Sequence, residues 1–82
     1  MKKTIIDVRT KEEFLGGHIE HSLNIPLQEI MNHVEEIKTM DAPIIFCCAS
    51  GGRSGQAAAY FNSLGIESEN GGGWMELNKK IQ

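Results

Sequence analysis

The sequence has no long hydrophobic run and no excess of basic residues, and each absence excludes a broad class of function. The longest apolar run, residues 44–49, contains six residues, whereas a transmembrane helix needs about 20. Eight Lys and Arg residues stand against eleven Asp and Glu residues, for a net charge of −3. Proteins that bind nucleic acids or anionic membranes usually carry a basic excess. We therefore expect neither a nucleic acid nor a membrane among the partners.

Cysteine is also scarce, and the two cysteines present, Cys47 and Cys48, are adjacent. Neighbouring Cα atoms lie about 3.8 Å apart, closer than the roughly 4.4–6.8 Å of a disulfide. The pair lacks the CxxC spacing of zinc and redox sites, so we expect no metal and no other cofactor. Free thiols suit a reducing compartment. Because the N-terminal MKKTIID has no apolar leader, we expect the cytoplasm, or the periplasm if a leader was removed.

The length and composition predict a single domain over residues 1–82. Hydrophobic residues make up 40% of the chain and charged residues 23%, which are ordinary values for folded proteins. The sequence contains no internal repeat, low-complexity tract or linker. A chain of this length buries only about 60% of its unfolded surface, so the core is thin.

Short β-branched or apolar runs alternate with helical patterns along the chain. Strands are expected at 4–8, 22–25, 44–47 and 66–70. Helices are expected after a capping box at Thr10 and Glu13, and at 27–37, 54–64 and 74–81. The glycines at 71–73 predict a flexible turn. This alternation predicts an α/β sandwich with a mostly parallel sheet, whose site lies beyond the C-terminal ends of the strands.

The segment FCCASGGRSGQAA, residues 46–58, carries the strongest functional signal. A strand leads to Cys48, and a loop of small residues at 49–52 leads through Arg53 to a helix that begins near Ser54. Such a loop lets successive backbone N–H groups turn inward, and the start of the helix adds further unpaired amides. Arg53 adds a permanent positive charge. Each of these groups favours a thiolate over a thiol at Cys48.

A cysteine and an arginine in such a loop suit either phosphoryl transfer or sulfur transfer. Four residues separate Cys48 from Arg53, one fewer than in tyrosine phosphatases. We interpret this loop as too tight for a phosphoryl group on the thiol but suited to one extra sulfur atom. A persulfide on Cys48 is therefore favoured, and a phosphatase or arsenate reductase is the less favoured alternative.

The chain resembles the rhodanese homology domain, in particular single-domain members such as the phage-shock-protein sulfurtransferases. The matching segments are IDVRTKEEF at 6–14, GGHI at 16–19, SLNIP at 22–26, CASGGRSGQAA at 48–58 and GGGWM at 71–75. The resemblance implies a three-layer α/β sandwich, with a small parallel sheet flanked by helices on both faces. It also implies a sulfurtransferase that moves a sulfane sulfur from thiosulfate or a persulfide to cyanide or a thiol. By the motif match, Cys48 is the nucleophile, and the cradle that binds the donor consists of Ala49, Ser50, Gly51, Gly52, Arg53 and Ser54.

Two features depart from the family pattern. Residues 49–52 are all neutral, whereas many thiosulfate-using members carry basic residues there, so a glutathione or protein persulfide is an alternative donor. Family members often have a strand and a helix before the DVR strand, and this chain begins almost at that strand, as a minimal or trimmed member would. The expected partners are a small anionic sulfur donor and a thiol or cyanide acceptor, with a protein persulfide as the alternative. A second interpretation is a persulfide carrier or interaction module with little small-molecule turnover.

Residues outside the loop are expected to be mainly structural. Asp7, Arg9 and Glu13 should tie the first strand to its helix, and Arg9 and Glu13 are close enough to pair. Cys47 should point to the opposite side of its strand from the reactive cysteine, into the core. Trp74 either lines the mouth of the active site or anchors the last helix.

Overall fold

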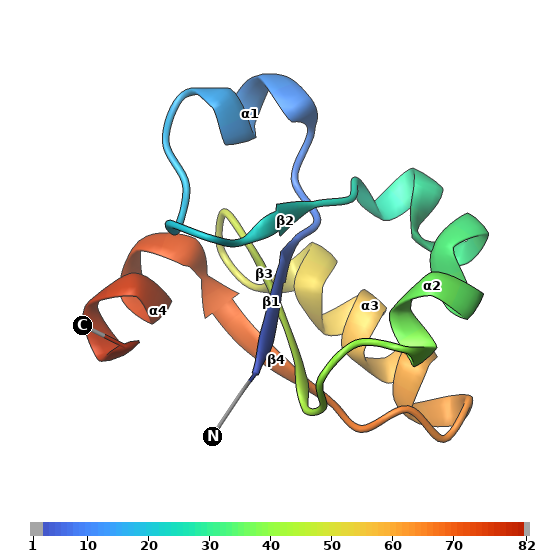
Figure 1. The fold of residues 1–82 in the computed structure, drawn as a ribbon. Helices are drawn as coiled ribbons and strands as arrows, with labels where there is room; N and C mark the ends of the chain where they lie inside the picture. Colours follow the sequence, from blue (N-terminus) through green and yellow to red (C-terminus); the bar gives the residue numbers. More distant parts are fainter. Residues whose placement is uncertain (1–2, 82) are drawn as a thin grey trace.

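The computed structural model describes residues 3–81, which form a four-stranded sheet with helices packed around it (Figure 1). In chain order the elements are β1 (Thr4–Asp7), α1 (Lys11–Leu15), β2 (Leu23–Asn24), the 3₁₀ helix η1 (Leu27–His33), α2 (Val34–Lys38), β3 (Ile44–Cys48), α3 (Gly52–Ser63), β4 (Ser68–Gly73) and α4 (Trp74–Ile81). The strands lie in the order β2-β1-β3-β4, and every neighbouring pair is parallel. The predicted α/β class with a parallel sheet is therefore confirmed. Because the strands are parallel, their C-terminal ends meet at one edge of the sheet, where β3 ends at Cys48.

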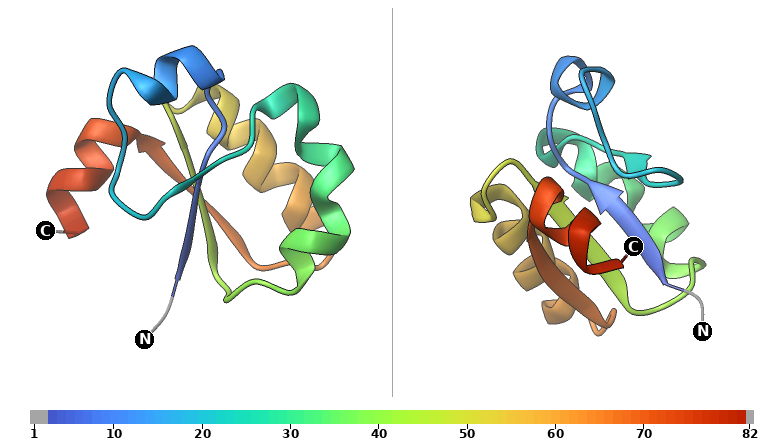
Figure 2. Two further views of the ribbon diagram at one scale, coloured as in Figure 1. Left: turned by 45° about the horizontal axis from the view of Figure 1, so that its top comes forward. Right: turned by 90° about the vertical axis from the view of Figure 1, so that its left-hand side faces the viewer.

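Helices cover both faces of the sheet, as a three-layer sandwich requires (Figure 2). On one face, residues of η1, α2 and α3 pack against β1 and β3, and the rings of Phe46 and Phe61 stack 5.3 Å apart. On the other face, Leu77 of α4 packs with Ile45 and Cys47. All five residues of β3 are buried, because a central strand of a parallel sheet is covered on both sides. Cys47 thus lies in the core, on the side of β3 opposite Cys48, as predicted.

The prediction of a flexible turn at 71–73 was wrong, because these three glycines form the end of β4. The pairing of β4 with β3 shifts register just before the last two residues of β3, which leaves Gly71 as an extra residue in β4. A Cβ atom on Gly71 would lie 2.8 Å from a methyl carbon of Leu77, and one on Gly73 would lie 2.8 Å from the carbonyl oxygen of Ala49. Glycine is therefore required by the close packing of β4 against α4 and against the loop after Cys48.

The segment predicted as one α-helix at 27–37 is divided into η1 and α2. A 3₁₀ helix aligns residues three apart, so Leu27 and Ile30 both contact the core. Met31 follows Leu27 by four residues and is turned outward, with 64% of its surface exposed. In residues 3–81, no helix has both the length and the apolar character needed to cross a membrane.

Candidate active site

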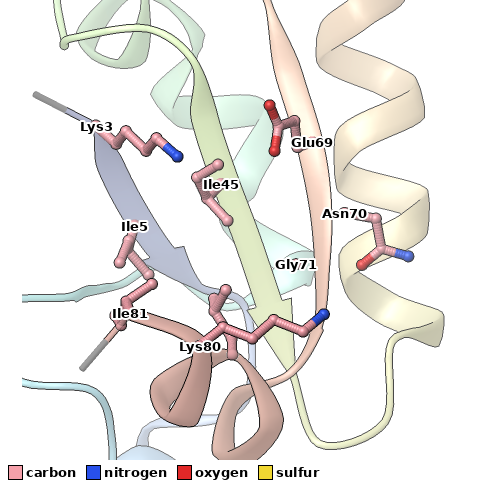
Figure 3. A pocket seen from close by; sticks show the side chains of 9 residues that line it. Lys3, Ile5, Ile45, Glu69, Asn70, Gly71, Lys80 and Ile81 are labelled. Carbon is pink, nitrogen blue, oxygen red and sulfur yellow. The ribbon is translucent and has the colours of Figure 1, made fainter. Parts of the chain in front are cut away.

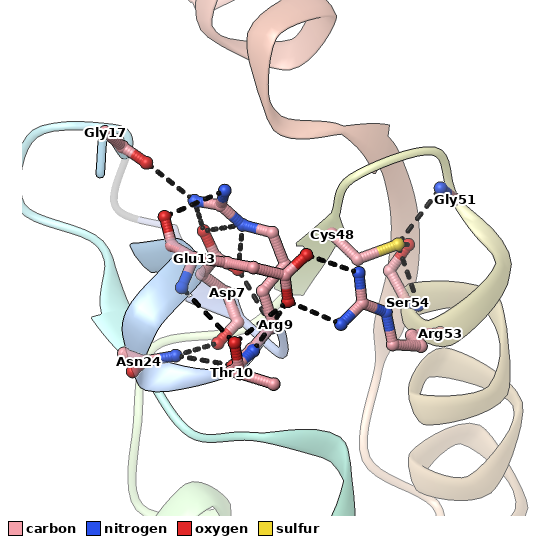
Figure 4. Close-up of polar contacts among 10 residues, drawn as sticks. All are labelled: Asp7, Arg9, Thr10, Glu13, Gly17, Asn24, Cys48, Gly51, Arg53 and Ser54. Carbon is pink, nitrogen blue, oxygen red and sulfur yellow. Dashed lines mark hydrogen bonds and ion pairs between the residues drawn. The ribbon is translucent and has the colours of Figure 1, made fainter. Parts of the chain in front are cut away.

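Cys48 ends β3, and the loop that follows wraps around its sulfur before α3 begins (Figure 4). Gly51 adopts φ +108°, a left-handed conformation that favours glycine. Its backbone N–H donates a hydrogen bond to Cys48 Sγ at 3.0 Å, and the N–H of Ser54 in the first turn of α3 donates at 3.5 Å. The Ser54 hydroxyl lies 3.3 Å from the same sulfur. The loop therefore places three polar groups around a side chain that is only 1% exposed.

These contacts give the two neighbouring thiols different pKa values. Burial alone raises the pKa of Cys48, but hydrogen bonds from the Ser54 hydroxyl and from the amides of Ser54, Gly51 and Ser50 outweigh it and lower the pKa to about 7. Among residues 3–81, no hydrogen bond is donated to the Cys47 thiol. Burial, with a further contribution from the negative charge of Asp7, raises its pKa to about 12. Cys48 is therefore the thiol that ionises near neutral pH.

Arg53 lies near enough to Cys48 for the two charges to interact, but its guanidinium is also paired with a carboxylate. Its two Nη atoms donate to the two carboxylate oxygens of Glu13 at 2.8 and 3.1 Å. The hydrogen bond from Arg53, followed by a bond from the Thr10 backbone, lowers the pKa of Glu13 to about 2. Glu13 also completes the predicted capping box of α1 with Thr10. The positive charge that Arg53 brings to the cradle is therefore neutralised by the carboxylate of Glu13.

The expected pairing of Arg9 with the Glu13 side chain was wrong. The guanidinium of Arg9 binds both carboxylate oxygens of Asp7, at distances of 2.7 to 3.0 Å, and reaches only the backbone carbonyl of Glu13. It also donates to the carbonyl of Gly17 and lies 4.9 Å from the centre of the Trp74 ring. Both members of the Asp7–Arg9 pair are buried. The pair joins the end of β1 to the α1 loop and α4, which is the structural role predicted for it.

Trp74 belongs to the face of the sheet opposite Cys48. Its side chain packs against the cluster that contains Ile45, Cys47 and Leu77. Of the two roles considered from the sequence, the structure therefore supports an anchor for α4. A separate cavity of about 320 Å³ also lies on this face and is lined by residues of β1, β3, β4 and α4, among them Ile5 and Lys80 (Figure 3).

Asn70 is a site residue that the sequence analysis missed. Its side chain points from β4 toward α3 (Figure 3). Its Nδ2 donates to the carbonyl of Gly51 at 3.0 Å, while its Oδ1 accepts from the Ser54 hydroxyl at 2.6 Å and from the N–H of Gly72 at 2.9 Å. No local sequence pattern marks this role, because only the pairing of β4 with β3 brings Asn70 beside the Cys48 loop.

Of the remaining loop residues, Ser50 contributes its backbone N–H, which helps to lower the pKa of Cys48. The side chains of Ala49 and Ser50 are exposed, and Gly52 begins α3 with no neighbouring atom within 4 Å of its Cβ position. Within the part of the chain that the structure describes, no group of three or more His, Cys, Asp or Glu side chains could hold a metal ion. The polar groups gathered around Cys48 are suited to holding a sulfur anion.

Comparison with known proteins decides the family. Residues 1–80 match the family model described as the rhodanese-like domain. The chain belongs to the rhodanese-like family. The fold of this rhodanese-like chain is similar to that of the solved structure titled "rhodanese with anions from E. coli". That match has a TM-score of 0.81 and 29% identity, and covers 90% of this chain and 89% of the other. The resemblance seen in the sequence and the rhodanese-like fold are both confirmed.

Two curated relatives are similar to this chain over most of its length. The thiosulfate sulfurtransferase PspE of Escherichia coli is 30% identical over 74 residues, which cover 88% of this chain and 71% of PspE. The uncharacterized protein YqhL of Bacillus subtilis is 46% identical over 57 residues, which cover 70% of this chain and 44% of YqhL. The matched segment spans less than half the length of YqhL and of a second relative, the Arabidopsis thaliana protein HIGH ARSENIC CONTENT 1. The homologues of this chain thus include named sulfurtransferases.

Proposed function

We propose that this rhodanese-like protein is a sulfurtransferase that carries sulfur as a persulfide on Cys48. The observation that supports the proposal most directly is the set of N–H groups from Gly51 and Ser54 that point at Cys48 Sγ. With the Ser54 hydroxyl they lower the pKa of Cys48 to about 7, although burial opposes this. A thiolate nucleophile is thereby available at neutral pH without a separate general base.

In the first step of the proposed cycle, the Cys48 thiolate attacks the outer sulfur of the donor. An S–S bond forms to Cys48 Sγ while the bond between the outer sulfur and the rest of the donor breaks. The leaving group departs with that electron pair, as sulfite from thiosulfate or as a thiolate from a persulfide. The same amides that hold the thiolate then stabilise the negative charge of the bound persulfide, as an oxyanion hole does.

In the second step, a thiolate or cyanide attacks the outer sulfur of the Cys48 persulfide. The S–S bond breaks, its electron pair returns to Cys48 Sγ, and the thiolate is restored. The acceptor leaves as a persulfide or as thiocyanate. Because Cys48 must return to a free thiolate in each cycle, a reducing compartment such as the cytoplasm suits the reaction.

The ion pair of Glu13 and Arg53 supports a persulfide as the preferred donor over thiosulfate. Thiosulfate carries a dianionic charge that a free guanidinium would bind, and here both Nη atoms of Arg53 already donate to Glu13. The same neutralisation, together with the nearly complete burial of Cys48, supports a second candidate function. In that function the protein accepts persulfide sulfur from a partner protein and turns over small molecules slowly.

Intact-mass measurement on the purified protein tests the proposal. The protein is incubated with thiosulfate or with glutathione persulfide, and an acceptor thiol is then added. We expect the mass of one sulfur atom to be gained and then lost, in the Cys47→Ala variant as in the native chain, but not in Cys48→Ser. Sulfur gained only from a protein persulfide would support the carrier function. Absence of a sulfur adduct with every donor, or hydrolysis of an aryl phosphate that depends on Cys48, would overturn the proposal.

A further inference from the structure

The hydroxyl of Ser54 lies between two groups that can each accept its single hydrogen. Its oxygen is 2.6 Å from Asn70 Oδ1 and 3.3 Å from Cys48 Sγ. A serine hydroxyl donates one hydrogen bond and accepts up to two. When Cys48 is a thiol, its S–H can donate to Ser54 Oγ while the hydroxyl donates to Asn70. When Cys48 is a thiolate it has no hydrogen to donate, and the hydroxyl must turn to Sγ to stabilise the charge.

Asn70 is placed so that it can release this hydrogen at little cost. When the hydroxyl turns away, Asn70 Oδ1 still accepts from the N–H of Gly72 at 2.9 Å. Its Nδ2 continues to donate to the carbonyl of Gly51 at 3.0 Å. Because Asn70 is exposed and both ends of its amide remain paired, the turn of the hydroxyl leaves no buried polar group unsatisfied. The hydroxyl of Ser54 can therefore serve either acceptor.

The geometry points to Asn70 as a positioning residue that competes with Cys48 for the Ser54 hydrogen and so controls how readily the thiolate forms. The inference concerns the nucleophile of the proposed sulfurtransferase and thus rests on that function for its biological meaning. On ionisation the proton of the Cys48 thiol passes to solvent, while Ser54 and Asn70 keep all their hydrogens. The thiolate and the persulfide both lack an S–H at Cys48 Sγ, so both take the Ser54 hydrogen that Asn70 holds in the thiol state.

Other charged groups surround β3 and must be separated from this effect. They lie on the neighbouring elements and the loops that follow them: Asp7 at the end of β1, Arg9 in the loop after β1, Glu13 on α1, Arg53 on α3 and Glu69 on β4. Cys47 lies on the opposite side of β3 and its pKa, raised to about 12 by burial, keeps it neutral. None of these groups is altered in the variants chosen below, so their contributions cancel when shifts are compared between backgrounds.

Titration of the thiolate absorbance of Cys48 in a double-mutant cycle tests the inference. Asn70→Asp keeps the shape of the side chain and makes the acceptor of the Ser54 hydrogen stronger. It also adds a charge and removes the N–H that Asn70 donates to the Gly51 carbonyl, and these two effects are present in both backgrounds of the cycle. Asn70 is exposed, so the new carboxylate stays hydrated and the fold is expected to tolerate it. We expect the pKa of Cys48 to rise by about one unit in the native background, which lowers the thiolate fraction at about pH 7 by about fivefold. In a Ser54→Ala background, where no hydroxyl remains to be held, the same substitution should raise it by less than half as much.

Two further variants keep the test decisive. Asn70→Ala removes the acceptor that competes for the Ser54 hydrogen. The change that it causes in the pKa of Cys48 should therefore be lower in the native background than in the Ser54→Ala background. For Asn70→Asp the change should be higher in the native background. Asn32→Asp makes the same chemical change in η1, where the residue is exposed, and should leave the pKa of Cys48 unchanged. Equal shifts in both backgrounds would show that Asn70 acts by charge or loop order alone and would overturn the inference. Since the titration uses no sulfur donor, its outcome is independent of whether the protein transfers sulfur.

Discussion

The difference in acidity between the two adjacent cysteines predicts that a neutral alkylating reagent such as iodoacetamide modifies Cys48 and largely spares Cys47. The pKa of Cys48 is about 7, because hydrogen bonds outweigh the effect of burial, and that of Cys47 is raised to about 12 by burial. At about pH 7, roughly half of Cys48 and about one molecule in 10⁵ of Cys47 is then thiolate. These thiolate fractions set the starting ratio of reactivity.

Intrinsic nucleophilicity reduces that ratio without reversing it. A thiolate of higher pKa is the stronger nucleophile, with a Brønsted slope of about 0.4–0.5. Over the difference of about five units this favours the Cys47 thiolate by about 100- to 300-fold. The net preference for Cys48 is therefore a few hundredfold at about pH 7.

Single-thiol variants measure the two reactivities separately. In Cys47→Ala, the alkylation rate followed by mass spectrometry should rise with pH and level off above a midpoint near the Cys48 pKa of about 7. In Cys48→Ser, labelling at neutral pH should be slower by a few hundredfold. A midpoint for Cys48 at the ordinary thiol value of about 8.5, or similar labelling rates in the two variants, would refute the argument that the loop amides and Ser54 stabilise this thiolate.

Three further predictions follow from the contacts of the site. Glu13→Gln keeps an acceptor for the α1 cap but removes the charge that neutralises Arg53. In steady-state assays, kcat/KM for thiosulfate should therefore rise relative to kcat/KM for glutathione persulfide, and most at low salt. An unchanged ratio would show that the ion pair does not determine which donor is preferred. The pKa of Glu13 is lowered to about 2 by the hydrogen bond from Arg53, so the stability it contributes is complete above the ordinary carboxyl pKa and is lost as pH falls toward about 2. Denaturant titrations should accordingly show the native chain losing more stability than Glu13→Gln over that range, and parallel losses would contradict this. Gly71→Ala places a Cβ 2.8 Å from a methyl of Leu77 and should lower the free energy of unfolding by about 1–3 kcal/mol, whereas Gly52→Ala meets no atom within 4 Å and should have little effect in the same urea titration.

Local sequence patterns predicted several elements of the fold correctly. The spacing of Thr10 and Glu13 predicted the capping box that the structure contains. The apolar run before Cys48 predicted a strand buried on both faces. The helix predicted at 27–37 was wrong over its first half, because 3₁₀ geometry over Leu27–His33 preserves the burial of Ile30 and exposes Met31.

The sequence alone determined the class of the fold and the loop that carries the reactive thiol. A short stretch of the sequence contains, in order, a strand, Cys48, small residues, Arg53 and the start of a helix. In such a loop the backbone amides turn toward the sulfur. The partners of that loop were decided only by tertiary structure. Glu13 lies 40 residues from Arg53 and Asn70 lies 16 from Ser54, and no local pattern encodes a contact across that distance. The parallel pairing of β4 with β3, its register shift at the glycines and the position of α1 over the site bring them together. The charge of the cradle and the hydrogen available to Cys48 are thus properties of the folded chain.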